Sequence, residues 1–132
     1  GDACEHNGQV TGLWPVAVEQ AKIAAINALG GTDQYQGIIP VTHLKVVGVE
    51  LTSVGQIEAK SPDDMIIVQE DVELHRYRKL IIAQGKVVGA ILLGYPLDAP
   101  AVTEVIKQAI DVTPYVETLQ AGVWDTLHGL AV

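Results

Sequence analysis

The sequence predicts an α+β fold: an N-terminal helix, then an antiparallel sheet of four to five strands, with C-terminal helices on one side of the sheet. Three observations support this. Apolar residues recur at helical spacing in residues 13–31, β-branched residues separated by turn signals fill residues 41–94, and helical spacing returns after residue 98. Strands that precede the helices, instead of alternating with them, favour an antiparallel sheet with helices on one face.

The first helix is expected between Leu13 and Gly30. Pro15 suits the first helical position, and Gly30-Gly31 supplies the left-handed residue that often ends a helix. The helix has two opposed apolar faces, one of alanine (Ala17, Ala21, Ala24, Ala25, Ala28) and one of Val16, Ile23 and Ile26. It is either a central core helix of this domain or a helix whose alanine face packs on a sheet outside the chain. We favour the second interpretation, because little sequence precedes the helix.

The strands follow a connection through Gly37 and Pro40, where we place a domain boundary. Residues 41–55 (VTHLKVVGVELTSVG), interrupted by Gly48, predict two strands or one bulged strand. Residues 65–71 (MIIVQED) predict a strand after the turn at residues 61–64. Residues 73–94 predict two strands joined at Gln84-Gly85.

The C-terminal helices begin with the sequence DAPAVTEVIKQAI. Asp98 is the expected N-cap and Pro100 lies in the first turn, while an apolar stripe is formed by Val102, Val105, Ile106 and Ile110. Two short helical segments, TPYVETLQAG and VWDTLHGL, are expected to follow.

The composition excludes several classes of function. With 132 residues, 48% of them hydrophobic, the chain fits one domain or a small domain plus a segment of another. Its formal net charge of −8 argues against nucleic-acid or anionic-membrane partners, and the basic stretch His75–Lys79 is interpreted as the solvated face of a strand. No apolar run is long enough to span a bilayer. Cys4 is the only cysteine, and the sequence has no signal-like start; these two observations favour a cytoplasmic location.

No self-contained active site is visible in the sequence. There is no GxGxxG after a strand, no GxxxxGK[ST] phosphate loop and no GxSxG elbow. The four histidines (His6, His43, His75, His128) are dispersed, so each is interpreted as structural or exposed and no metal site is expected.

Four ordered segments nevertheless carry a resemblance: GDACEHNG, GLWPVAVEQAKIAAINALGG, VTHLKVVGVELTSVG and YRKLIIAQGKVVGAILLG. This set resembles FAD-dependent pyridine-nucleotide oxidoreductases, in particular the NADH:rubredoxin reductases and the flavin subunit of assimilatory NAD(P)H nitrite reductase. The resemblance covers most of the chain and weakens near its C-terminus. It implies that residues 1–38 end an FAD-binding domain and that residues 39–132 form a C-terminal reductase or dimerisation-type domain.

The resemblance also implies cofactor-binding residues. In the family, the aspartate of a Gly-Asp pair accepts a hydrogen bond from a ribityl hydroxyl of FAD, and Gly1-Asp2 matches that pair. The N-terminus of the next helix, which faces the pyrimidine side of the flavin, corresponds here to Trp14, Pro15, Val16 and Ala17. Lys45 matches a recurrent lysine that faces the flavin or the electron acceptor. The alternatives are a turn or cap role for Asp2, a core or interface role for Trp14, and a solvated strand position for Lys45.

By this resemblance, the chain is the C-terminal part of an oxidoreductase that passes electrons from a nicotinamide through FAD to a protein or metal centre, such as rubredoxin or sirohaem. Its partners would be upstream FAD- and NAD(P)-binding domains, a redox protein as acceptor and, as a further candidate, a second copy. The helix would pack its alanine face on the FAD fold and its isoleucine face on the C-terminal domain.

Some family features are missing. Neither glycine-rich dinucleotide fold is present, so the chain alone is expected to be inactive and to retain no FAD. The His-Pro…Glu dyad and the CxxC pair of disulfide reductases are also missing, which disfavours disulfide reduction, and Cys4 is expected to be a buried, inert thiol. The alternative function is a non-catalytic interaction or dimerisation module.

Overall fold

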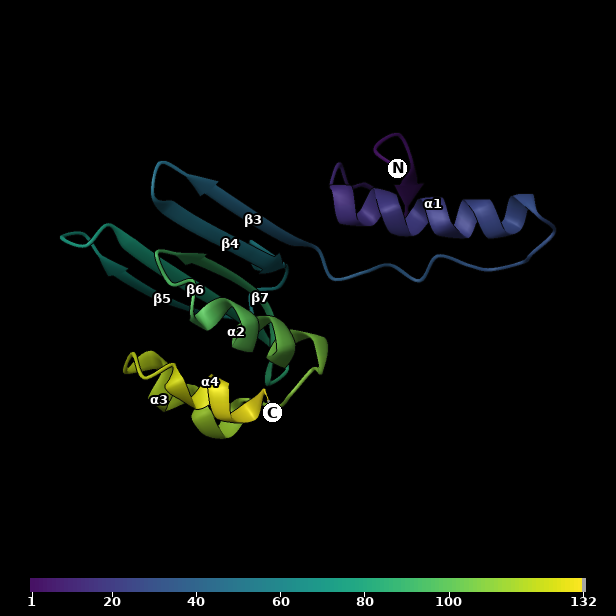
Figure 1. Ribbon diagram of the computed structural model, residues 1–132. Helices are drawn as coiled ribbons and strands as arrows, with labels where there is room; N and C mark the ends of the chain where they lie inside the picture. The colour runs from purple at the N-terminus through teal and green to yellow at the C-terminus, as the bar shows by residue number, and fades with distance from the viewer. Residues whose placement is uncertain (132) are drawn as a thin grey trace. The chain divides into compact units, whose positions relative to one another are not determined.

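The computed structural model describes residues 1–131, which divide into two compact units on either side of Pro40 (Figure 1). The first unit begins with a short hairpin, β1 (Glu5–His6) and β2 (Gln9–Val10), that turns at Asn7-Gly8. Helix α1 (Trp14–Ala28) follows, and residues 32–40 return without helix or strand structure. The predicted first helix is therefore confirmed.

The two ends of α1 form for local reasons. Pro15 lies in the first turn, and Gly30, with φ of 94°, takes the left-handed conformation that ends the helix. The Asn27 side chain exchanges two hydrogen bonds of 2.8 and 2.9 Å with the backbone of Asp33, which fixes the start of the return segment. Val16 is the one buried residue of the helix, and the alanine face from Ala21 onward is exposed. That other domains cover both faces of α1 remains a prediction.

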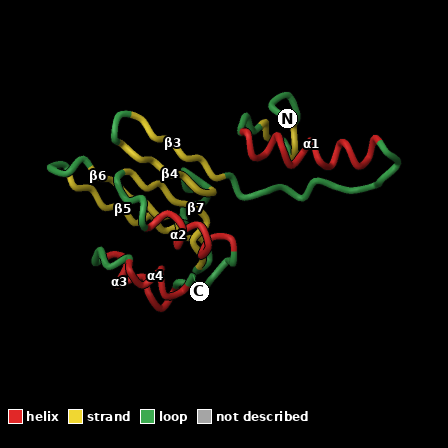
Figure 2. The backbone as a smooth tube through the Cα atoms, viewed as in Figure 1, coloured by secondary structure: helices red, strands yellow, loops and turns green. Residues whose placement is uncertain are grey.

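The second unit contains a five-stranded antiparallel sheet in the order β3-β4-β7-β6-β5 (Figures 1 and 2). The strands are β3 (Val41–Val46), β4 (Val49–Gly55), β5 (Met65–Asp71), β6 (Arg76–Ala83) and β7 (Lys86–Leu93). Residues 41–55 thus form two strands, one of the two predicted alternatives, and the hairpin at Gln84-Gly85 is confirmed.

The turn between β3 and β4 carries backbone strain. Val47 and Gly48 have φ of 49° and 80°, as in a two-residue type I′ turn, and Val46 pairs directly with Val49. The left-handed conformation suits glycine or asparagine, whereas a β-branched valine is unfavourable there. Val47 is also 96% exposed, so no packing interaction compensates for the strain.

We therefore expect Val47→Asn to raise the free energy of unfolding by about 1 kcal/mol, because asparagine adopts the left-handed conformation at lower energy. Urea denaturation of the two proteins measures the difference. Val49→Asn is the control, because Val49 is also a solvent-accessible valine of this hairpin but lies in a strand, where asparagine is disfavoured. Equal stability of wild type and Val47→Asn would contradict the interpretation of the turn.

The C-terminal helices pack on one face of the sheet. Helix α2 (Asp98–Lys107) contacts β4 and β7, α3 (Val116–Gln120) contacts β5, and α4 (Asp125–Leu130) packs on α2; a 3₁₀ turn at Thr113–Tyr115 precedes α3. The core between them contains Val54, Leu80, Ala90, Leu92, Val102, Val105, Leu119, Trp124 and Leu127. The predicted α+β class, with helices after the sheet, is confirmed. Ile110, expected in the α2 stripe, lies beyond the end of that helix.

Two predictions near this core are wrong. Asp98 is not an N-cap: Leu97 occupies that position, and the Asp98 carboxylate lies 2.8 Å from Arg78 Nη1 and 3.2 Å from His128 Nε2. The basic stretch His75–Lys79 is not a uniformly solvated face, because the Arg78 side chain is only 12% exposed. A long-range ion pair therefore replaces the expected local cap.

Arg78 connects β6 to strand β5, to the start of α2 and to the loop after α3. Its Nε donates to Gln69 Oε1 and its Nη2 donates to the Gly122 carbonyl, each at 2.8 Å. The guanidinium carbon lies 4.2 Å from the ring centre of Trp124 and 4.5 Å from that of Tyr95. Arg78 thus combines cation–π contacts to two aromatic rings with three charge-assisted hydrogen bonds, the third to Asp98. We refer to this arrangement as the Arg78 cluster.

The other face of the sheet carries apolar side chains that are about half exposed: Leu44, Val46, Val49, Ile66 and Val68. At one end of this face the chain after β4 crosses directly over Gly89 of β7. The Gln56 N–H donates to the Val88 carbonyl at 3.0 Å, and a Cβ built on Gly89 would lie 1.8 Å from the Gln56 carbonyl oxygen. This crossing requires glycine at position 89.

Candidate functional site

The Gly-Asp pair lies against the first turns of α1. A Cβ built on Gly1 would lie 3.7 Å from the Cβ of Ala17, so the backbone at Gly1 passes close to this face of the helix. The Cys4 N–H donates to the Gly1 carbonyl at 2.8 Å, which closes a turn that contains Asp2, and the Asp2 side chain is exposed. The structure thus places Gly1 beside Ala17, with Asp2 next to it in an exposed turn.

The N-terminus of α1 has no side-chain cap and no acidic residue in its first turn. The first intrahelical bond runs from the Ala17 N–H to the Leu13 carbonyl at 3.0 Å. Pro15 has no N–H, so the N–H groups of Trp14 and Val16 precede the helical hydrogen-bond pattern. Together with the helix dipole, they give this end partial positive charge that suits a negatively charged group.

Trp14 and Cys4 are both exposed, which contradicts the expectation for Cys4 alone. Trp14 is 80% exposed, so it is not a core residue of this unit and its indole is available to a ligand or another domain. Cys4 was expected to be buried, but it is exposed, and its Sγ lies 3.1 Å from the Gly1 amino group. Its position in a surface turn, one residue before a two-residue strand, explains the exposure.

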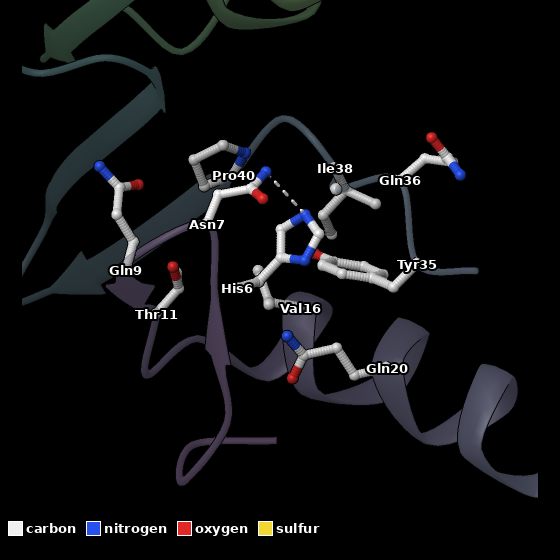
Figure 3. A pocket seen from close by; sticks show the side chains of 11 residues that line it. His6, Asn7, Gln9, Thr11, Val16, Gln20, Tyr35, Gln36, Ile38 and Pro40 are labelled. Atoms are coloured by element: carbon white, nitrogen blue, oxygen red, sulfur yellow. Dashed lines mark hydrogen bonds between the residues drawn. The ribbon is translucent and has the colours of Figure 1, made fainter.

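A polar cavity lies on a different face of α1 (Figure 3). It has a volume of about 230 Å³ and lies between the β1–β2 hairpin, the helix and the return segment, with His6, Thr11, Val16, Gln20, Tyr35 and Ile38 in its lining. The His6 and Tyr35 rings meet edge to face at 4.8 Å, and the Asn7 amide lies 3.2 Å from His6 Nε2. Gln20 Oε1 is buried there without a hydrogen-bond partner among the described residues.

The sequence analysis did not predict this cavity. The Asn7-Gly8 pair was the available signal, since Asn-Gly between short alternating segments favours a two-residue hairpin that folds back on the helix. His6 and Tyr35 are the titratable residues of the lining, and no carboxylate or thiol accompanies them. The cavity can accept hydrogen-bond donors such as water at Gln20, but it has no nucleophile with an adjacent base.

Lys45 lies in the second unit, on β3, where its ammonium group bonds to Glu50 on β4. The hydrogen bond that Lys45 donates to the Glu50 carboxylate, and then the negative charge of Glu50, raise the pKa of Lys45 above its ordinary value. The side chain is 76% exposed, as the solvated-strand alternative predicted. Within residues 1–131, no group of three or more His, Cys, Asp or Glu side chains could hold a metal ion, and no helix is long and apolar enough to cross a membrane.

The family match and the similar proteins all point to the same group of reductases. Residues 40–110 match the family model of the rubredoxin NAD+ reductase C-terminal domain. The chain is 32% identical to the nitrite reductase [NAD(P)H] of Bacillus subtilis over 86% of its own length and 14% of that protein. It is 34% identical to the NADH-rubredoxin oxidoreductase of Clostridium acetobutylicum over 84% of its length and 27% of that protein.

Solved structures agree with this fold. The crystal structure of NADH:rubredoxin oxidoreductase from Clostridium acetobutylicum superposes with a TM-score of 0.64 at 26% identity, covering 86% of this chain and 29% of that one. The chain therefore spans less than a third of the relatives it matches. Since the family model covers more than half of the chain and the predicted resemblance is confirmed, this chain belongs to the rubredoxin NAD+ reductase C-terminal domain family.

Proposed function

We propose that this chain is the C-terminal part of an FAD-dependent NAD(P)H oxidoreductase that passes electrons to a redox protein or a metal centre. Two of its relatives are named for nitrite reduction with NAD(P)H and for NADH-rubredoxin electron transfer. The observation that carries the proposal is the position of Gly1, followed by the exposed Asp2, beside Ala17 in the first turns of α1. The single cysteine is the basis for proposing a cytoplasmic location.

The residues at this site fit an FAD molecule. The exposed Asp2 carboxylate can accept a hydrogen bond from a ribityl hydroxyl, and the backbone at Gly1 lies close to the helix. The uncapped N–H groups of Trp14 and Val16, in a first turn that contains no acidic residue, can stabilise negative charge on the pyrimidine ring. Bound FAD would supply the hydride chemistry, while these residues would bind and orient it.

The first test measures FAD binding by the 132-residue chain. After incubation with excess FAD and desalting, we expect the visible absorbance bands of flavin to be absent, because this chain contains no glycine-rich fold to bind the pyrophosphate. Retained flavin bands would mean that the chain alone contains a complete FAD site, which would contradict its assignment as one part of a larger site.

The second test uses the longer polypeptide that the proposal requires. There, Asp2→Ala should weaken FAD binding by about tenfold or more, since a hydrogen bond to a charged group contributes about 1.5–3 kcal/mol. Asp33→Ala is the matched control, because Asp33 is an exposed aspartate of the same unit that follows the C-terminus of α1, whereas Asp2 precedes its N-terminus. Unchanged flavin content and turnover in Asp2→Ala would remove the residue-level basis of the proposal.

The second candidate function is a non-catalytic interaction or dimerisation module. The exposed alanine face of α1 favours it, since such a face allows the close approach of another backbone. The Asp2→Ala experiment also distinguishes the two functions, because an interaction module has no need for this carboxylate.

A further inference from the structure

Strand β3 presents an unoccupied hydrogen-bonding edge within its own unit. It lies at the end of the strand order and pairs only with β4 among the described strands. In a two-residue hairpin, the pair that flanks the turn is hydrogen-bonded and the pairs then alternate. The pairs Val46–Val49 and Leu44–Leu51 therefore bond across the hairpin, whereas Lys45 and His43 direct their N–H and C=O groups away from β4.

A second contact supports this assignment. The Glu50 carbonyl accepts a hydrogen bond from the Gly94 N–H at 2.9 Å, so the backbone of Glu50 faces β7. Its partner Lys45 must then face outward. The outward-facing edge at His43 and Lys45 can pair with a further extended strand.

A groove of about 570 Å³ runs beside this edge, between the β3–β4 hairpin and α2. Val41, Pro96, Ala99 and Pro100 give it an apolar lining. At its floor the ring of His43 is held by a 2.9 Å hydrogen bond between Nδ1 and Oγ1 of Thr52, which is buried. The groove lies on the same face of the sheet as the side chains of His43 and Lys45, so a strand added to β3 would direct alternate side chains towards it.

We propose that the β3 edge and this groove bind an extended, basic segment of a partner protein by strand addition. The main chain of the segment would pair with His43 and Lys45, and an apolar side chain would enter the groove between Val41 and the prolines. This proposal does not rest on FAD binding or on electron transfer, because it uses residues of the second unit alone.

The charges around the groove indicate which side chains the partner segment should carry. The groove contains the carboxylates of Glu50 and Glu104, the ammonium of Lys107 and the ring of His43, and Lys45 pairs with Glu50 at its side. These charges nearly balance, so the groove itself suits an apolar side chain. Residues 41–132 carry twelve Asp or Glu and seven Lys or Arg, a net charge of −5, which favours association with a segment that carries lysine or arginine at its outward positions.

The experiment uses the 132-residue chain and a fluorescein-labelled heptapeptide of alternating lysine and valine. Fluorescence anisotropy measures binding, and amide hydrogen exchange locates it. We expect the peptide to slow exchange at His43 and Lys45. Thr42 and Leu44, whose N–H groups already bond to β4, should change little.

Two variants of one residue separate backbone pairing from side-chain effects. Lys45→Pro removes an outward N–H from an edge strand, where proline is tolerated, and should weaken peptide binding by about tenfold. Lys45→Ala removes the same side chain and its pair with Glu50 but retains the N–H, so its affinity should stay near that of the wild type. Circular dichroism checks the fold of both variants.

Three outcomes would overturn the proposal. The peptide leaves exchange at His43 and Lys45 unchanged, or both variants bind it equally well, or the same amides become protected without peptide as protein concentration rises. The last result would identify a second copy of the chain as the occupant. Because the exchange measurement is made on the wild type, it decides the question even if Lys45→Pro does not fold.

Discussion

Replacement of Arg78 by alanine should lower the free energy of unfolding by about 3 kcal/mol or more, the largest loss that we expect from a single polar residue. Removing one partner of a buried ion pair leaves the other uncompensated, and such changes usually destabilise by about 3–5 kcal/mol. Here the orphaned group is the Asp98 carboxylate, which is 13% exposed and has His128 as its remaining partner. The loss of stacking on Trp124 and Tyr95 adds to the effect.

Urea denaturation followed by tryptophan fluorescence measures this loss. Trp124 is the one buried tryptophan of the described chain and lies in the Arg78 cluster, so it reports on the same region. Arg76→Ala is the control, because Arg76 is two residues away on the same strand, is exposed, and lies 5.6 Å from the Tyr95 ring centre. If both variants lowered the free energy of unfolding by a similar, small amount, the Arg78–Asp98 ion pair would not connect the sheet to the helices.

Replacement of Gly89 by alanine should destabilise the protein by about 3 kcal/mol, at the upper end of the range for overpacked buried sites. The added Cβ would overlap backbone atoms of Gln56, with its carbonyl oxygen at 1.8 Å and its carbonyl carbon at 2.6 Å. No side-chain rotation can relieve the contact of this Cβ with backbone atoms, so β4 and β7 must move apart or residues 56–60 must move away from β7.

Gly129→Ala is the matched control for this prediction. Gly129 is exposed in α4, and nothing lies within 4 Å of a Cβ built on it. Alanine should therefore stabilise the protein there by about 0.5–1 kcal/mol through its helix propensity. Thermal denaturation should move the two variants in opposite directions. A Gly89→Ala protein as stable as the wild type would mean that the Gln56 crossing is not rigid.

The strands were predictable because their signals are local. Gly48 and the Gln84-Gly85 pair mark tight turns, and the β-branched residues between them show where each strand runs. The strand order was not predictable in the same way, since the pairing of β4 with β7 depends on residues far apart in the sequence. For the same reason, nothing beside Asp98 indicated that its partner would be Arg78, which lies twenty residues earlier.

The candidate site was predictable only by resemblance. Composition and spacing give no reason to select Asp2 or the N-terminus of α1, and the ordered family segments supplied both. The structure adds the closeness of Gly1 to Ala17, the uncapped helix end and the exposed Trp14. Cys4 shows the limit of such reasoning: an expected small apolar position suggested burial, whereas the local turn leaves the thiol exposed.

The strand order β3-β4-β7-β6-β5 also bears on how the second unit reaches its native state. The β3–β4, β5–β6 and β6–β7 pairs are hairpins between consecutive strands, so each closes a short loop. The β4–β7 pair joins strands separated by two others, and its loop-closure entropy is the greatest in the sheet. That pair unites the two halves of the sheet, and α2 packs on both of its strands. The step with the highest entropic cost is thus the one that creates the surface on which the first C-terminal helix docks.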